Sequence, residues 1–293
     1  MKCLYDVPAP AKLNLFLHIV GKRADGYHLL QSAFTLIDWC DTMHFEVRGD
    51  GGISREDLGP SLPSDDLIVR AARALQGATT TRNGVHIGVD KRIPAQAGMG
   101  GGSSDAASCL LALNRLWRLG LSVADLARIG LTLGADVPFF LGGRNAWVEG
   151  IGEKITPLRL ASARYLVVKP PQGLQTGRIF AHPELRIGTK TATISGFAVN
   201  PRGFGCNDLQ TAAECLCPGV TQGLAWLASH GLQGRMTGSG SAVFAWALED
   251  RMGIDLGMNL GELPNAFEAR WCSGLEVHPL VGWASSEDLP VGG

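Results

Sequence analysis

A run of glycines between a predicted strand and a predicted helix constrains this chain more than any other feature. Gly98 and the glycines at 100–102 give a backbone that can adopt positive φ and approach a ligand closely. Alternating apolar and polar residues over 85–91 predict a strand before the glycines, and apolar residues at helical spacing over 106–117 predict a helix after them. We expect the polar residues at 103–105 to cap this helix.

The loop ends at the amino end of a helix, and this position indicates what the loop binds. Free backbone N–H groups and the positive end of the helix dipole favour an anion there, so we predict a polyphosphate ligand. The P-loop pattern fails because no Lys follows the glycines, and the dinucleotide pattern fails because Ser103 stands where its third Gly belongs. A flexible Gly/Ser linker is the alternative, but a linker has no reason to join a strand directly to an amphipathic helix.

The loop sequence resembles the Gly-rich motif of the GHMP kinases, which phosphorylate small alcohols with ATP. Met99 stands where Leu is usual, and Gln96 and Ala97 replace residues that are often small or glycine. The resemblance implies an ATP site in residues 94–104, hereafter the phosphate loop. Its members are Pro94, Ala95, Gln96, Ala97, Gly98, Met99, Gly100, Gly101, Gly102, Ser103 and Ser104. Magnesium is expected with ATP; no dedicated carboxylate ligand is evident, so we expect Ser104 and the phosphates to hold most of the ion.

The segment 9–20 alternates polar and apolar residues and predicts a half-buried strand near the start of the chain. Lys12 and Asn14 lie two residues apart and point to the same face. A lysine on a solvated strand face is the ordinary interpretation. However, the segment resembles the first motif of the GHMP branch whose alcohol substrate carries a cytidine diphosphate group. That resemblance implies that Lys12 and Asn14 face the substrate.

Asp25 and Gly26 predict a hairpin turn that places Tyr27 and His28 at the start of the next strand. These two rings could simply cover the core with their polar tips in water. The same branch has this Asp-Gly-Tyr-His signature, which implies that Tyr27 and His28 contact the cytidine.

Asp136 lies at an irregular junction, because Pro138 pushes the preceding residue toward extended geometry. A carboxylate at such a junction is often only a helix cap. The surrounding Gly-Ala-Asp-Val-Pro-Phe segment resembles the GHMP motif that carries the proposed catalytic base. The resemblance implies that Asp136 deprotonates the alcohol and that Lys12 keeps Asp136 ionised and stabilises the developing alkoxide.

Two later segments complete the expected site. Thr176 and Phe180 resemble a second substrate-contacting segment, although a buried core Phe is the alternative for Phe180 and Gly177 departs from the commoner residue. Gly238, Ser239 and Gly240 form a glycine-serine turn that resembles the third GHMP motif. We expect this turn to support the phosphate loop.

The resemblance implies a two-domain α+β GHMP kinase fold with its active site in the cleft between the domains. Length agrees with two domains, which we place at residues 1–156 and 157–293. After Asp250 the pattern predicts two helices and a strand. The alternatives are another GHMP kinase acting on mevalonate, homoserine or a sugar, and a nucleotide-binding sensor without catalysis; a sensor could dispense with Lys12 or Asp136.

Composition limits the partners and the compartment. A net charge of −1 gives no basis for a nucleic-acid or membrane partner. The chain lacks a long apolar run and an apolar leader, and its seven Cys do not form a zinc-binding pattern, so we expect a cytoplasmic protein with reduced thiols and a small-molecule substrate.

Overall fold

The computed structural model describes residues 1–247 and 263–286. The elements in these residues are, in chain order, β1 (Cys3–Lys22), β2 (His28–Arg48), β3 (Ile53–Asp57), α1 (Leu67–Ala78), β4 (Gly84–Asp90), α2 (Gly101–Leu116), α3 (Val123–Leu131), α4 (Val137–Gly142), β5 (Ala146–Gly150), β6 (Lys154–Pro157), β7 (Arg164–Lys169), α5 (Thr176–Phe180), α6 (Ile194–Val199), α7 (Gln210–Leu216), α8 (Pro218–Ser229), β8 (Gly234–Met236), β9 (Val243–Trp246) and β10 (Glu268–Leu275). The two helices predicted after Asp250 fall largely outside the described residues, and the predicted strand is β10.

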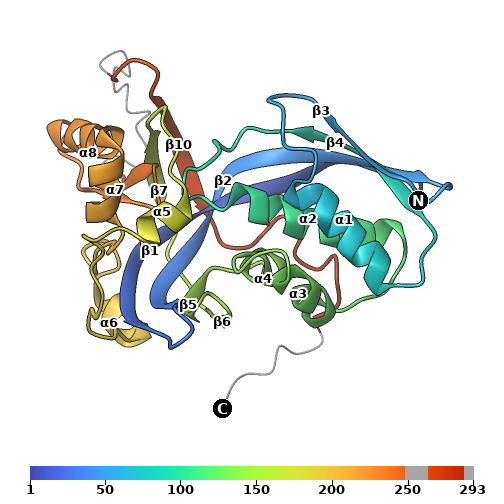
Figure 1. The fold of residues 1–293 in the computed structure, drawn as a ribbon, viewed down its shortest axis with the longest axis horizontal. Coiled ribbons are helices and arrows are strands. Elements are labelled where there is room, and N and C mark those ends of the chain that lie inside the picture. The colour runs from blue at the N-terminus through green and yellow to red at the C-terminus, as the bar shows by residue number, and fades with distance from the viewer. Residues whose placement is uncertain (248–262, 287–293) are drawn as a thin grey trace.

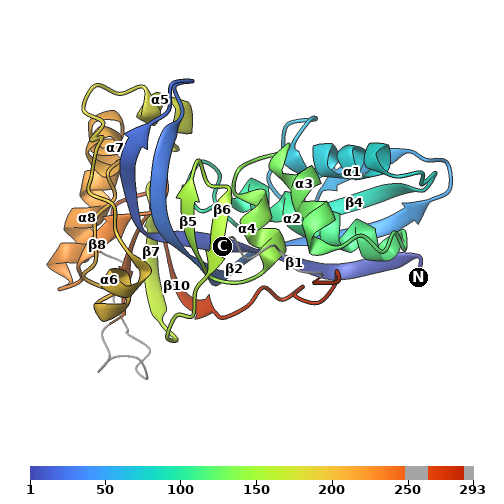
Figure 2. The ribbon, with the colours of Figure 1, turned by 90° about the horizontal axis from the view of Figure 1, so that it is seen from below.

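The long antiparallel hairpin of β1 and β2 organises the molecule. On its other edge β2 pairs in succession with β5, β10 and β4, and the sheet order is β3-β4-β2-β10-β7-β9-β8. Figures 1 and 2 show α1–α4 gathered at one end of the molecule and α7 and α8 at the other, with β1 and β2 running through both. The expected α+β fold with two lobes is therefore confirmed.

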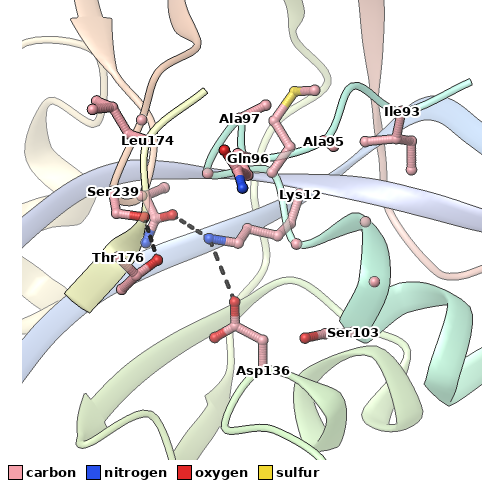
Figure 3. Close-up of a pocket in the computed structure, with 18 of the residues that line it drawn as sticks. Lys12, Ile93, Ala95, Gln96, Ala97, Ser103, Asp136, Leu174, Thr176 and Ser239 are labelled. Carbon is pink, nitrogen blue, oxygen red and sulfur yellow. Dashed lines mark hydrogen bonds and ion pairs between the residues drawn. The ribbon is translucent and has the colours of Figure 1, made fainter. Parts of the chain in front are cut away.

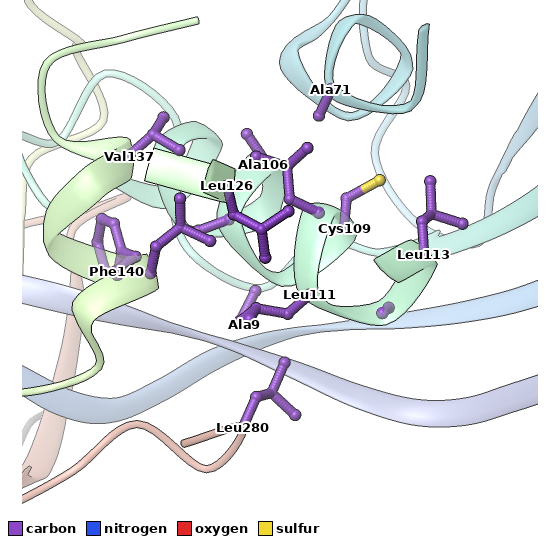
Figure 4. Packing of buried hydrophobic residues seen from close by; sticks show 14 of the residues in the cluster. Ala9, Ala71, Ala106, Cys109, Leu111, Leu113, Leu126, Val137, Phe140 and Leu280 are labelled. Carbon is purple, nitrogen blue, oxygen red and sulfur yellow. The ribbon is translucent and has the colours of Figure 1, made fainter. Parts of the chain in front are cut away.

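The first lobe has a core made by helices packed on the hairpin. Buried apolar residues of α1, α2, α3 and α4 meet those of β1, β2 and β4, as Figure 4 shows for part of the cluster. The predicted stripe on α2 is buried throughout: Ala106, Cys109, Leu110, Leu113 and Trp117 are all at most 5% exposed. At the other end, the second half of β1 packs against β7, β9 and the helices that cover them.

Two local expectations were wrong. The polar residues 103–105 do not cap α2, because Gly100 is the N-cap and Ser104 and Asp105 have other partners. The strand expected to be half-buried is buried on both faces over 9–19, because the phosphate loop and the segment around residue 207 cover the side that alternation assigned to solvent.

The carboxyl end of the described chain returns to the first lobe. Leu280 and Ala284 join the first core, and residue 277 forms a β-bridge with Arg144. The division into two domains near residue 156 stays a prediction. We propose it with one change, which assigns the returning segment at 277–284 to the first domain. No helix of the described residues is long and apolar enough to cross a membrane.

Candidate active site

A cavity of about 730 Å³ lies between the two lobes, which is a suitable volume for a small-molecule ligand. Its walls come from β1, β2, the phosphate loop, the start of α4, the segment around α5 and the turn at 238–240. The predicted site residues that line it are Lys12, Asn14, the phosphate loop from Pro94 to Ser103, Asp136, Thr176, Phe180, Gly238, Ser239 and Gly240. Thus most of the residues chosen from four separate motifs meet in one cavity.

Lys12 and Asp136 face each other in this cavity, as Figure 3 shows. Their Nζ and Oδ2 atoms are 3.7 Å apart, and the side chains are 4% and 31% exposed. Asp136 occupies the N-cap position of α4, but its side chain makes no capping hydrogen bond. Its carboxylate is therefore directed at Lys12 and the cavity rather than used to begin the helix.

The ammonium group of Lys12 is held from three sides. It donates to Oδ1 of Asn14, whose Nδ2 in turn donates to Oγ of Ser32 at 2.9 Å. It also lies 4.7 Å from the centre of the Phe34 ring, a cation–π distance. Burial lowers the pKa of Lys12, while the carboxylate of Asp136 acts in the opposite direction. The result is a fixed cation beside a carboxylate that reaches solvent.

The phosphate loop presents the amino end of α2 to the cavity. Gly100 adopts positive φ (71°) as N-cap and supplies no side chain, so the first N–H groups of α2 are left without a side-chain acceptor. These N–H groups belong to residues that line the cavity, and the helix dipole adds to their attraction for an anion. The error about capping therefore strengthens the expectation of anion binding.

The turn at 238–240 and its neighbours are bonded to the phosphate loop. The N–H groups of Ser241 and Ala242 donate to the carbonyls of Gln96 and Ala97, at 3.1 and 3.2 Å. Thr237 joins three segments, because its Oγ1 accepts from the N–H of Asn14 at 2.9 Å and donates to the carbonyl of Gly98 at 3.4 Å. Lys12 is tied to the same loop, since its N–H donates to the Met99 carbonyl at 3.0 Å.

Three predicted residues do not line the cavity. Ser104 is fully buried, and its hydroxyl donates to the Pro10 carbonyl at 2.6 Å. Tyr27 is 61% exposed. His28 stacks on Phe180, with ring centroids 5.1 Å apart and planes 22° apart, so it contacts a residue of the cavity wall without lining the cavity itself.

Thr176, at the start of α5, is linked to the turn at 238–240. Its Oγ1 lies 2.8 Å from Oγ of Ser239, and both side chains are exposed at the cavity, as Figure 3 shows. Of the residues that hold this site together, the sequence motifs did not indicate Ser32, Phe34 or Thr237. Ser32 and Phe34 lie on one face of β2 and could have been found as the polar and aromatic members of a strand paired with the first motif. No local sequence pattern indicated that Thr237 belongs to the site.

The donor set suits magnesium only in part. No group of three or more His, Cys, Asp or Glu side chains that could hold a metal occurs in residues 1–247 and 263–286. The Ser103 hydroxyl and the Asp136 carboxylate do line the same cavity. One hydroxyl and one carboxylate are consistent with an ion held mainly by phosphates and water.

Comparison with known proteins agrees with this geometry. The N-terminal domain model of the GHMP kinases matches residues 66–144, and their C-terminal domain model matches residues 198–253. The chain is 66% identical to the 4-diphosphocytidyl-2-C-methyl-D-erythritol kinase of Albidiferax ferrireducens, covering 100% of this chain and 99% of the relative. It is 61% identical to the enzyme of the same name from Paracidovorax citrulli, covering 98% of this chain and 100% of the relative.

Solved structures show the same relationship. A crystal structure of 4-(cytidine 5'-diphospho)-2C-methyl-D-erythritol kinase has a TM-score of 0.75 and 33% identity, and covers 93% of this chain and 99% of its own. A crystal structure of mevalonate kinase has a TM-score of 0.65 at 15% identity, covering 92% of this chain and 99% of its own, which shows a shared fold.

Proposed function

Because the chain belongs to the GHMP kinases, and within them to the family of the 4-diphosphocytidyl-2-C-methyl-D-erythritol kinases, we propose that its cavity carries the transfer of a phosphate from ATP to that alcohol. The chain is an ATP-dependent kinase of the non-mevalonate isoprenoid pathway. The acceptor we assign is the tertiary 2-hydroxyl. The observation that carries the proposal is the Lys12–Asp136 pair, 3.7 Å apart beside the amino end of α2.

Phosphoryl transfer requires the γ-phosphate to be aligned with the attacking hydroxyl and its charge to be neutralised. In our proposal the free N–H groups at the start of α2 hold the triphosphate. Asp136 accepts the proton of the substrate hydroxyl, and Lys12 stabilises the oxygen as negative charge develops on it. Asn14 and Phe34 hold the Lys12 ammonium so that it need not reorganise during the reaction.

Magnesium, when bound, neutralises part of the triphosphate charge. We propose that the phosphates and the Ser103 hydroxyl hold it, because the Ser104 hydroxyl is engaged with Pro10. The reaction consumes ATP, and we propose the cytoplasm, where ATP is supplied, as its location.

The direct test is mass spectrometry of 4-diphosphocytidyl-2-C-methyl-D-erythritol after incubation with the protein, ATP and magnesium. One added phosphate supports the proposal. Mevalonate, homoserine and a sugar are tested in parallel under the same conditions. Phosphorylation of one of these in preference to the cytidine-containing alcohol overturns it, and so does ATP binding without transfer to any acceptor.

Lys12 gives a pH-dependent prediction. The protonated lysine is the form that stabilises the alkoxide, and burial lowers its pKa, so kcat should fall as pH rises through a value below that of an ordinary lysine, about 10.4. In Lys12→Arg the cation persists to above about pH 12, so the alkaline fall should move up or vanish even where turnover is lower. The measurement is kcat against pH for both proteins, with circular dichroism at each pH to verify folding. If kcat of the Arg variant falls at the same alkaline pH as that of the wild type, Lys12 is not the group that stabilises the alkoxide.

Phe180 gives a prediction for the base-binding end. Stacking of a base on an aromatic ring is worth about 1–3 kcal/mol, so Phe180→Leu should raise KM for the cytidine-containing alcohol about tenfold or more. KM for ATP should stay the same, because the phosphate loop does not depend on this ring. Phe180→Tyr retains the ring and is the matched control. Equal KM values for the alcohol in the Leu and Tyr variants would show that Phe180 is only a core residue.

A further inference from the structure

A buried ion cluster joins the two ends of the phosphate loop. Lys91, the residue just after β4, donates its ammonium to Oδ2 of Asp41 on β2 and to Oδ2 of Asp105 on α2, the latter at 2.5 Å. The side chains of Lys91, Asp41 and Asp105 are 11%, 0% and 3% exposed. The motifs gave no role to Lys91 or Asp41, and Asp105 was expected only to cap α2.

Asp41 also fixes the backbone where the loop begins. Its Oδ1 accepts from the N–H groups of Arg92 and Ile93, at 2.6 and 2.7 Å. One carboxylate thus holds both the lysine and the two peptide N–H groups just before the phosphate loop. Because Asp41 belongs to the hairpin that carries Lys12, the loop is anchored to the strand pair that forms the catalytic side of the cavity.

The cluster lies directly under the proposed triphosphate site. Lys91 and Asp105 both line the cavity, and a Cβ on Gly101, the first residue of α2, would be 3.6 Å from Nζ of Lys91. The Asp105 carboxylate is in the first turns of the helix whose N–H groups face the cavity. The ammonium group of Lys91 therefore links the segment just before the phosphate loop to α2, the helix that follows the loop.

We propose that Lys91 is a positioning residue for ATP binding, which holds the start of the phosphate loop and the first turns of α2 in register through Asp41 and Asp105. This inference rests on the proposed function. Lys91 acts through the loop and transfers no proton or phosphate.

The charge balance of the cluster explains why Lys91 is needed. Burial lowers the pKa of Lys91, but Asp105 and Asp41 more than offset this, so its pKa is raised and it stays charged. Burial raises the pKa of Asp105 to about 8 against the opposing effect of Lys91, and Asp41 adds to the rise. Without the ammonium, two buried carboxyl groups would face each other with no cation between them, and Asp105 would lose its link to the start of the loop.

The test compares Lys91→Met with the charge-balanced double variant Lys91→Met/Asp105→Asn. A buried, unpaired carboxylate destabilises the fold, so the single variant should have a lower Tm, and the double variant should recover much of it. Both lack the link between residues 91 and 105. Since a misplacement of about 1 Å can cost up to about 100-fold, we expect both to raise the Kd and KM for ATP–magnesium about tenfold.

The division between KM and kcat separates positioning from simple loss of folding. Partial unfolding lowers the apparent kcat but leaves both KM values as they are. We expect KM for ATP to rise in both variants while KM for the alcohol stays within about twofold. An unchanged KM for ATP in Lys91→Met, or full recovery of that KM with Tm in the double variant, overturns the inference. If the wild-type protein binds ATP but phosphorylates no acceptor, the proposed function is wrong. The Kd measurements for ATP still test the role of Lys91 in that case.

Discussion

Asp136→Asn should lower kcat by about 10²–10⁴-fold, because general-base assistance is worth about that much. The amide has nearly the shape of the carboxylate but cannot accept the proton of the substrate hydroxyl. Asp136 lines the cavity, and its Oδ2 lies 3.7 Å from Nζ of Lys12. The Kd for ATP–magnesium should change by less than about threefold, since the proposed triphosphate contacts come from backbone N–H groups.

Folding should be nearly unaffected by this substitution. Asp136 is at the N-cap position of α4 but makes no capping hydrogen bond, and it is 31% exposed. Asp125→Asn is the matched control, because Asp125 is also near the start of a helix and pairs with a basic residue, yet it lies outside the cavity. The control should lose some Tm through its capping box and keep its kcat. Single-turnover rates measure the chemical step in each protein, and an Asp136→Asn rate within about threefold of wild type would remove the catalytic base from this mechanism.

Features set by neighbouring residues could be predicted from the sequence. Asp66 caps α1 by accepting from the N–H of Val69 at 3.0 Å. Ser122 forms a capping box with Asp125 at the start of α3. Such contacts join residues three apart in the sequence, so a short sequence segment contains both the donor and the acceptor.

Features set by distant residues could not be predicted in this way. Ser104 was a reasonable cap, but the Pro10 carbonyl, 94 residues away, takes its hydroxyl. Thr237 reaches Asn14 across 223 residues, and Lys91 reaches Asp41 across 50. Each depends on how the hairpin, the phosphate loop and the third motif pack together. The motif resemblance supplied the residues of the site, and only the structure supplies the residues that hold them in place.

The prediction of a half-buried strand from the alternation along β1 failed for a related reason. Lys12, Asn14 and His18 are polar, which indicates a solvated face, yet each is at most 6% exposed. Their face is covered by the phosphate loop and by the segment around residue 207, whose carbonyl and carboxylate groups accept from Leu17 and Ile19. Polar residues on a buried face need specific partners, and the partners of Lys12 include Asp136, the proposed catalytic base.

Gly98→Ala should reduce kcat/KM for ATP by about 100-fold, because a displacement of about 1 Å in a substrate-positioning loop can cost that much. A Cβ at residue 98 would lie 2.2 Å from the Thr237 carbonyl oxygen and 2.8 Å from the Gly240 N–H nitrogen. Both contacts are with backbone, so no flexible side chain can move aside. The phosphate loop and the third motif would have to separate, and Thr237 would be drawn away from the N–H of Asn14 beside Lys12.

Backbone strain must be separated from this clash. Gly98 has a φ of +74°, where alanine costs roughly 1–2 kcal/mol wherever it occurs. Gly120→Ala is the matched control, since Gly120 has a φ of +68° and no atom within 4 Å of an added Cβ. The two variants should lose similar stability from strain, while only Gly98→Ala should lose ATP affinity, measured by titration calorimetry with ATP–magnesium on protein verified as folded. Equal ATP affinity in both would show that contact between the two loops is not what holds the phosphate site. The chain would then have to bind the triphosphate through α2 alone, with the third motif serving only the core of the second lobe.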